Sequence, residues 1–203
     1  MDDEEHLAEI IKGLEASVAY FAPGTTKARE LYTAESFIEN LHVDFTNDEL
    51  VSPDDDPPDI VFRGARFEIK EILDPGRRRH AEYKAALKRA KTLTDPKDSY
   101  EMFTPKDAHI ADILGRCESA ASELRTKYPS AVRAGLDLLF YVNLQRVFHL
   151  IEAPFPSTGH LADLGWRSIS FVMGQRSCCL YARDDAPDFI AAVLGRVIHL
   201  HPK

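Results

Sequence analysis

The sequence predicts an α/β fold, a mixed sheet flanked by helices, and three observations lead to this class. Apolar residues recur at helical spacing in several long stretches. Two short runs with the alternating pattern of strands meet at Gly64. Residues 136–142 (LDLLFYV) form the unbroken apolar run that is typical of a strand buried on both faces.

The N-terminal part of the chain is predicted to be helical. Residues 4–20 carry apolar side chains at helical spacing with acidic residues in the first turn, and Pro23 with Gly24 ends this helix. A second helix is predicted over residues 26–42. Its apolar stripe consists of Leu31, Ala34, Ile38 and Leu41.

The rest of the chain is predicted to alternate loops, strands and helices. The elements expected in its middle part are a loop at 46–58 with a short strand near Leu50 and Val51, strands at 59–63 and 66–72, and a basic helix at 77–93. Those expected further on are a loop at 94–105, a helix at 106–128, the strand at 136–142, a hairpin of strands 167–173 and 177–182, and a helix at 188–200.

Neither a repeat nor a linker divides the chain, so one domain over residues 1–203 is expected. In this prediction the helix at 4–20 is an appendage, residues 28–142 form the core, and residues 160–203 contribute a C-terminal hairpin and helix.

Charge is unevenly distributed along the chain. The net charge of −8 argues against a protein that coats nucleic acid by charge alone. Residues 1–59 hold sixteen acidic side chains against three basic ones, whereas residues 77–93 hold seven basic side chains against Glu82 alone. Part of this basic set forms one stripe on the predicted helix: Arg77, Lys84, Lys88 and Lys91. The stripe predicts contacts with nucleic-acid phosphates, although such stripes are as often simple solvated surface.

Three features predict a cytoplasmic protein. The N-terminus, Met1-Asp2-Asp3-Glu4-Glu5, is acidic where a secretory signal would be basic and then apolar. The sequence contains no run of about eighteen apolar residues, so no membrane-spanning helix is expected. Its three cysteines lack zinc-type spacing and are expected to be buried and reduced.

The most informative stretch is the predicted hairpin around Gly64. A two-residue loop that begins at residue 63 puts Asp59 opposite Glu68, and a loop that begins one residue later puts Asp59 opposite Lys70. Both registers place these three side chains on one face of the hairpin, because Glu68 and Lys70 are two residues apart. A three-residue loop without a bulge would break the arrangement.

Two carboxylates about 5 Å apart across a hairpin suit a hard cation such as Mg²⁺ or Mn²⁺, which prefers oxygen ligands. Such a cation polarises a phosphoryl oxygen and lowers the pKa of a bound water, while a nearby lysine can orient or activate that water and stabilise charge on the phosphate. Asp59, Glu68 and Lys70 are therefore candidates for a metal-dependent phosphodiesterase site. The alternative is a solvated strand pair whose Glu68 and Lys70 are surface charges.

At these positions the sequence resembles the PD-(D/E)xK nuclease superfamily, since Pro58-Asp59 precedes a short hairpin and Glu68-Ile69-Lys70 follows it. Within that superfamily the chain is similar to a group of uncharacterised bacterial proteins described as endonucleases. The resemblance implies a restriction-endonuclease-like mixed sheet with an αβββαβ core, and hence a single nuclease-like domain. It also implies that Asp59, Glu68 and the backbone carbonyl of Ile69 bind the metal, and that Lys70 is the catalytic lysine.

The superfamily often adds a glutamate from the helix before the hairpin, and Glu30, Glu35 and Glu39 compete for this role. Glu35 lies roughly 70° and Glu39 roughly 110° from the centre of the predicted apolar stripe. Glu35 can reach the edge of the sheet with less strain, so it is the preferred fourth member of the catalytic set.

Three functions are weighed for this sequence. The leading hypothesis is a Mg²⁺- or Mn²⁺-dependent endonuclease acting on DNA, with RNA as the alternative substrate because no residue reports on a 2′-hydroxyl. The second is a catalytically silent nucleic-acid-binding or adaptor protein with a nuclease-like fold. The third is an interaction protein whose acidic N-terminal region, residues 1–25, binds a protein partner or forms a homodimer.

Overall fold

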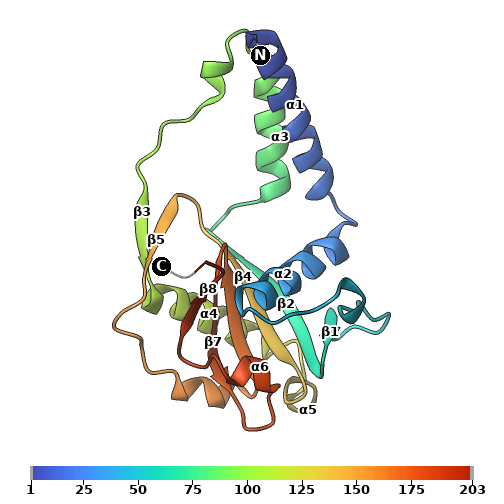
Figure 1. Cartoon of the computed structure of the whole chain (residues 1–203), viewed down its shortest axis with the longest axis vertical. Helices are drawn as coiled ribbons and strands as arrows, with labels where there is room; N and C mark the ends of the chain where they lie inside the picture. Colours follow the sequence, from blue (N-terminus) through green and yellow to red (C-terminus); the bar gives the residue numbers. More distant parts are fainter. Residues whose placement is uncertain (1, 202–203) are drawn as a thin grey trace. The chain divides into compact units, whose positions relative to one another are not determined.

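A mixed sheet of six strands is the centre of the larger of two units in the computed structural model, which describes residues 2–201 (Figure 1). Across the sheet the strands follow the order β1-β2-β4-β6-β7-β8. Strands β2, β4 and β6 are parallel to one another, whereas β1, β7 and β8 pair antiparallel. The strand bounds are β1 Ile60–Phe62, β2 Ala65–Leu73, β4 Asp137–Asn143, β6 Ser168–Met173, β7 Arg176–Ala182 and β8 Val197–His199. The predicted α/β class with a mixed sheet is confirmed.

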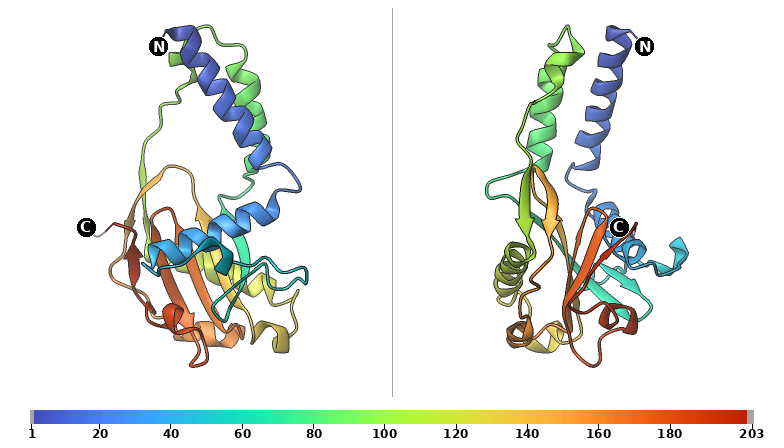
Figure 2. Two further views of the ribbon diagram at one scale, coloured as in Figure 1. Left: turned by 45° about the vertical axis from the view of Figure 1, so that its right-hand side comes forward. Right: turned by 60° about the vertical axis from the view of Figure 1, so that its left-hand side comes forward.

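Helices cover both faces of this sheet (Figure 2). On one face lie α2 (Thr26–Asn40) and the short α6 (Asp188–Ala191), where Phe37 and Ile190 are fully buried. On the other face lies α4 (Ile110–Leu124), whose Ile113 and Cys117 share a buried cluster with Trp166. Both faces of the central strands are therefore covered, as their unbroken apolar sequence predicts.

Shorter elements complete the larger unit. They are the 3-10 helices η1 (Asn47–Glu49) and η3 (Gly159–Leu164), the single-turn helix α5 (Ser130–Arg133), and a second, two-stranded sheet of β3 (Lys106–His109) and β5 (Val147–Ile151).

The helix predicted over residues 106–128 begins later than expected. Residues 106–109 instead form strand β3, which pairs parallel to β5 and buries Ala108. Helix α4 follows directly, and the Asp112 carboxylate accepts a hydrogen bond from the backbone N–H of His109 at 3.2 Å. Strand pairing with a distant segment therefore overrides a helical pattern that is continuous in the sequence.

The helix predicted over residues 188–200 is also much shorter. Helix α6 ends at Ala191, and Gly195 turns the chain with a φ of +70°. Val197 and His199 then pair with β7, so that the β-branched end of the chain becomes the edge strand β8.

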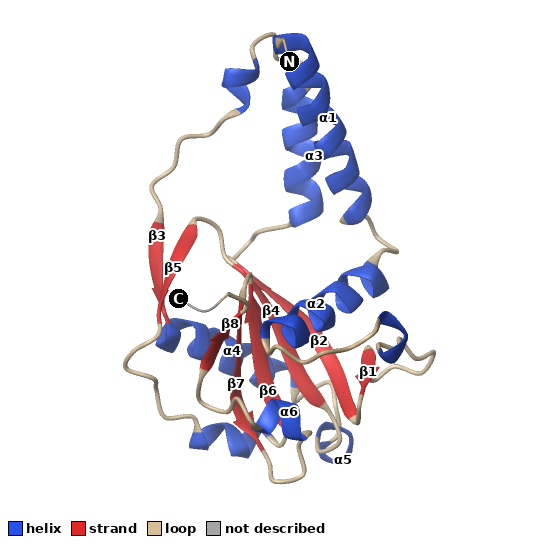
Figure 3. Cartoon of the chain, viewed as in Figure 1, coloured by secondary structure: helices blue, strands red, loops and turns tan. Residues whose placement is uncertain are grey.

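The smaller unit is built from two segments, Met1–Thr26 and Asp74–Pro105. It contains helices α1 (Asp3–Tyr20) and α3 (Arg79–Ala90) and the 3-10 helix η2 (Pro96–Ser99) (Figure 3). The prediction that the whole chain is a single nuclease-like domain stays a prediction. Within residues 2–201, none of the helices has both the length and the apolar character needed to cross a membrane.

Aromatic contacts hold the smaller unit together. The ring of Phe21 stacks on that of Tyr83 with centroids 5.0 Å apart, and the guanidinium of Arg79 lies 3.8 Å from the centroid of Phe21. Near the end of α3, Lys91 forms an ion pair with Glu15 of α1 at 2.7 Å.

Asp137, at the start of β4, links three strands of the main sheet. Its buried carboxylate accepts hydrogen bonds from the backbone N–H of Arg66 (2.9 Å), the hydroxyl of Ser168 (2.8 Å) and Nε of Arg167 (3.0 Å). Arg167 also donates to the carbonyl of Gly64 at 2.9 Å. This network ties the turn before β2 to β4 and β6.

We expect Asp137→Ala to lower the free energy of unfolding by about 3–5 kcal/mol, because it leaves the Arg167 charge and buried donors without an acceptor. Urea denaturation measures this change. Asp185→Ala is the matched control: its ion pair with Arg183 (3.0 Å) is exposed, so a loss of less than about 1 kcal/mol is expected. Equal losses in the two variants would contradict the role of Asp137.

Candidate active site

The turn of the β1–β2 hairpin consists of Arg63 and Gly64, because Phe62 pairs with Ala65. Both turn residues have a positive φ, 42° and 81°, as a two-residue turn of type I′ requires. Gly64 adopts this conformation without steric cost. Arg63 is held there by an ion pair with Glu49, with Nε and Oε2 2.5 Å apart.

This turn sets the register of β1 against β2 in the segment that directly follows Asp59. Ile60 pairs with Phe67, and the backbone N–H of Asp59 donates to the carbonyl of Phe67 at 2.9 Å. The even-length turn that the predicted site requires is thus present.

Alternation along β2 separates the polar side chains from the apolar ones. Phe67 and Ile69 are buried in the cluster under α2, whereas Ile72 belongs to the cluster under α4. Glu68 and Lys70 are an even number of residues from Ile72, so their side chains project from the same face of the strand, the face covered by α4.

Lys70 lies between two carboxylates. Its Nζ is 2.6 Å from Oε1 of Glu68 and 3.6 Å from Oδ2 of Asp59. Burial acts to lower the pKa of Lys70, but the hydrogen bond with Glu68 and the charges of Asp59 and Glu68 outweigh it and raise the pKa above its usual value. Lys70 therefore stays protonated at neutral pH.

Glu68 is the most deeply buried acid of the cluster, with none of its side chain exposed. Its Oε1 accepts a second hydrogen bond, from the hydroxyl of Tyr128 at 2.5 Å. Burial, followed by this hydrogen bond, raises the pKa of Tyr128, so the phenol keeps its proton. The other oxygen, Oε2, is also buried and has no hydrogen-bond partner among residues 2–201. A buried carboxylate oxygen in that state is costly unless a ligand satisfies it.

Asp59 and Asp56 complete a set of three carboxylates with Glu68. One oxygen from each of the three lies within 4.8 Å of the others. Asp59 is one-tenth exposed, and its Oδ2 accepts the backbone N–H of Ile69 at 2.7 Å. Asp56 is exposed and was not predicted, because the run of acids at 54–56 resembles an ordinary polar loop.

The acid that α2 contributes is Glu30, which is hydrogen-bonded to Asp59. Burial raises the pKa of Glu30 to about 7; the Asp59 charge adds to this effect and the Lys70 charge opposes it. Glu35, the preferred candidate from the sequence, lies five residues further on and so about 140° away around the helix. None of the interactions described at this site within residues 2–201 involves Glu35, and its catalytic role stays a prediction.

The phase of α2 explains this difference. The predicted apolar stripe included Leu31, which is exposed, and left out Phe37, which is fully buried. The buried side of α2 consists of Thr33, Ala34, Phe37, Ile38 and Asn40. The centre of this buried side lies roughly 60° around the helix from the centre of the predicted stripe. Glu30 therefore lies on the buried side of α2. Phe37 was the signal in the sequence that would have favoured Glu30.

The structure therefore brings Asp59, Glu68 and Lys70 together as the sequence predicted, and it adds Glu30 and Asp56. The catalytic roles of the predicted residues stay predictions, as does the role of the Ile69 carbonyl as a metal ligand.

The basic stripe belongs to the smaller unit. Within that unit Arg77 pairs with Glu82 at 3.0 Å, and Lys91 pairs with Glu15 at 2.7 Å. Its other two members, Lys84 and Lys88, are exposed on α3. Of the four basic residues in the stripe, Lys84 and Lys88 are therefore the two without an ion pair among the interactions described in this unit.

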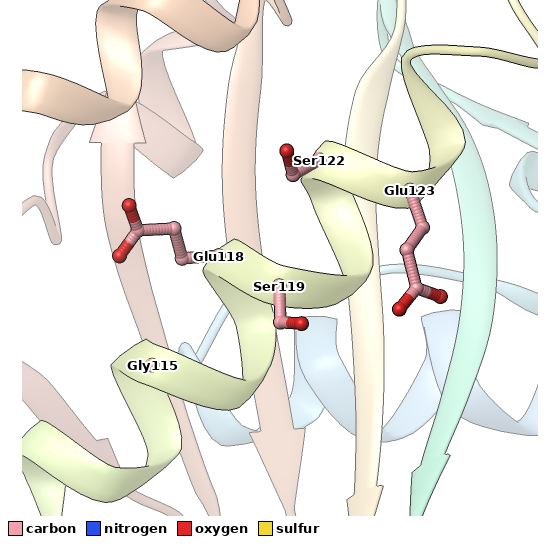
Figure 4. Close-up of a pocket in the computed structure, with 5 residues that line it drawn as sticks. All are labelled: Gly115, Glu118, Ser119, Ser122 and Glu123. Atoms are coloured by element: carbon pink, nitrogen blue, oxygen red, sulfur yellow. The ribbon is translucent and has the colours of Figure 1, made fainter.

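A shallow surface hollow lies elsewhere, along the exposed side of α4 (Figure 4). Its lining residues all come from this one helix: Gly115, Glu118, Ser119, Ser122 and Glu123. None of these lining residues belongs to the acid–lysine cluster.

The fold and the cluster define a class: an α/β protein with a partly buried lysine among carboxylates near the edge of a mixed sheet. Over residues 2–203 the chain matches the model of a protein family described as "Putative endonuclease, protein of unknown function (DUF1780)". Because the match spans almost the whole chain, the chain belongs to this family.

A solved structure from Pseudomonas aeruginosa strain PAO1 is also similar to the chain. The two are 26% identical, the TM-score is 0.68, and the match covers 98% of this chain and 96% of the other. That protein is described as one of unknown function in the monooxygenase superfamily. No curated protein matches the chain.

We expect Glu30→Gln to reduce the pH dependence of stability. Glu30 keeps its proton up to about pH 7 when folded but ionises near its usual pKa of 4.5 when unfolded. The folded chain therefore binds the extra proton, and stability falls as pH rises through this interval. Through this group the wild type should lose on the order of 2 kcal/mol between pH 5 and pH 8, after allowance for solvent screening.

Urea denaturation at pH 5 and pH 8 tests this expectation, with Glu35→Gln as the matched control on the same helix. Glu30→Gln should lose less stability than the wild type over this range, and the control should behave as the wild type does. The same pH dependence in both variants would contradict the placement of Glu30 beside Asp59.

Proposed function

We propose that the chain is a metal-dependent phosphodiesterase of the PD-(D/E)xK type that cleaves DNA internally. The observation that carries the proposal is the carboxylate of Glu68. It is fully buried, its Oε1 is held by Lys70 and Tyr128, and its Oε2 has no partner among residues 2–201. Two further carboxylates lie beside it, so the cluster has an excess of negative charge that a divalent cation would balance.

The order of elements supports a restriction-endonuclease-like core. Helix α2 is followed by a bridge in which Val51 and Val61 exchange backbone hydrogen bonds at 2.8 and 3.0 Å. Then come β1, β2, α4 and β4, with β4 parallel to β2. If Val51 counts as the first strand, this sequence of elements corresponds to αβββαβ, with residues 74–105 and β3 inserted before α4.

Mg²⁺ or Mn²⁺ fits this donor set, because hard divalent cations prefer carboxylate oxygens and keep several waters. Asp56, Asp59 and Glu68 would hold the cation, with the carbonyl of Ile69 as a further proposed ligand. A bound cation supplies Lewis acidity and lowers the pKa of a coordinated water.

Lys70 has a charge-stabilising role in the proposed reaction. Its raised pKa keeps the amine protonated, so it offers positive charge to the phosphate instead of accepting a proton from water. Asp59 and Glu68 hold this ammonium in place, and Glu30 supports Asp59 through their hydrogen bond.

The family description supports a nucleic-acid substrate, and we propose DNA. The monooxygenase label applies to the Pseudomonas aeruginosa protein. Neither the comparisons nor the described residues 2–201 support the homodimer or protein partner that was the third hypothesis for the acidic N-terminal region.

Substitution of any one member of the core set, Asp59, Glu68 or Lys70, should strongly slow cleavage. We expect Asp59→Ala, Glu68→Gln and Lys70→Ala each to lower the rate of plasmid DNA cleavage by on the order of 10²–10³-fold. The assay measures conversion of supercoiled DNA with Mg²⁺ or Mn²⁺, and chelation of the metal should stop it.

Asp184→Ala is the control, because Asp184 is an exposed acid in the loop after β7. Cleavage retained in all three site variants would refute the proposal. A wild-type protein that binds DNA but shows no calorimetric binding of Mn²⁺ would instead favour the catalytically silent adaptor.

The basic stripe is proposed to contact the DNA backbone. The double variant Lys84→Ala/Lys88→Ala should weaken binding of unrelated DNA sequences equally and reduce the slope of log Kd against log salt by about 2, one for each lost phosphate contact. Lys12→Ala removes another exposed lysine of the smaller unit and should leave the slope unchanged. An unaltered slope in the double variant would mean that the stripe is solvated surface.

A further inference from the structure

The hydroxyl of Tyr128 lies against the buried carboxylate on which the proposed function depends. Tyr128 follows α4 and is sixty residues away from Glu68 in sequence, outside the motif at residues 58–70. Its hydroxyl donates to Oε1 of Glu68 at 2.5 Å. No pattern in the sequence predicts this contact.

The two oxygens of Glu68 are in different environments. Oε1 receives hydrogen bonds from both Tyr128 (2.5 Å) and Lys70 (2.6 Å), whereas Oε2 receives none from residues 2–201. A free carboxylate can present either oxygen, or both, to a cation. With two donors on Oε1, only Oε2 is left as a ligand.

Lys127 fixes the direction in which the Tyr128 hydroxyl donates. The Nζ of Lys127 lies 2.7 Å from this hydroxyl and 4.7 Å from the centroid of the ring. An ammonium group can only donate, so the hydroxyl oxygen accepts from Lys127 and its single proton points to Glu68.

The position of the Tyr128 ring does not depend on its hydroxyl. The ring is almost fully buried and packs edge-on against Trp166, with centroids 5.9 Å apart. The backbone carbonyl of Tyr128 accepts from Arg133 at 2.5 Å, and Arg133 also donates to the carbonyl of Leu164 at 3.1 Å. A phenylalanine at this position would keep these contacts and lose only the donor to Glu68.

We propose that Tyr128 is a positioning residue that orients Glu68 so that Oε2 alone binds the divalent cation. The inference rests on the proposed function, since it concerns the same cation site. Hydrogen bonds that orient a ligating carboxylate commonly change metal affinity or activity by about 10- to 100-fold.

Calorimetric titration of Mn²⁺ into the full-length Tyr128→Phe variant tests this role. We expect its Kd for Mn²⁺ to rise about tenfold or more and its kcat for DNA cleavage to fall, while KM for DNA is unchanged. The fluorescence of Trp166, the only tryptophan, should stay as in the wild type because the ring contact remains. Tyr32→Phe is the control: Tyr32 is half exposed and contacts Tyr141, away from the carboxylates.

Lys127→Met is a second variant that retains the tyrosine and tests the same chain of hydrogen bonds. It should raise the Kd for Mn²⁺ in the same direction and by a smaller factor. If Mn²⁺ binds Tyr128→Phe and Lys127→Met as tightly as the wild type, the positioning role is overturned and the proposed function stands. If the wild type itself does not bind Mn²⁺, the proposed function fails, and the positioning role fails with it.

Discussion

The register of the β1–β2 hairpin is the constraint on which the candidate site depends. A slip of one residue would turn every side chain of β2 to the opposite face and separate Asp59 from Glu68. The turn that sets this register is held from two sides: Glu49 pairs with Arg63, and Arg167 donates to the carbonyl of Gly64. Arg167 in turn is bound by Asp137 at the start of the central strand β4, so the interior of the sheet fixes the geometry of its edge.

The candidate site holds more acidic than basic side chains. Four carboxyl groups, those of Glu30, Asp56, Asp59 and Glu68, belong to the same cluster as the partly buried ammonium of Lys70. Burial is the main cause of the raised pKa of Glu30, and the neighbouring charge of Asp59 adds to it. Carboxylates this close together lower the stability of the folded protein unless a cation or substrate balances their charge. This loss of stability is the physical reason to connect the cluster with the proposed catalysis.

Local patterns in the sequence predicted what depends on near neighbours. The alternation at 66–72 predicted strand β2, and the spacing of Glu68 and Lys70 predicted that they share a face. The failures all involve distant partners. Residues 106–109 and Val197 with His199 became strands because unpaired strands elsewhere were available to them. The apolar stripe of α2 was predicted out of phase because the packing of Phe37 against Phe67 is a tertiary contact, while the catalytic role of Glu35 stays a prediction.

The sequence by itself determined the fold class and the face on which Asp59, Glu68 and Lys70 project, because side-chain direction in a strand has a period of two residues. Only the tertiary structure decided which other groups reach them. Tyr128 comes from the turn after α4 and Glu30 from α2, and the complete burial of Glu68 depends on the elements packed over the sheet. Burial and long-range contacts depend on how elements pack in three dimensions, and no local period in the chain encodes that packing.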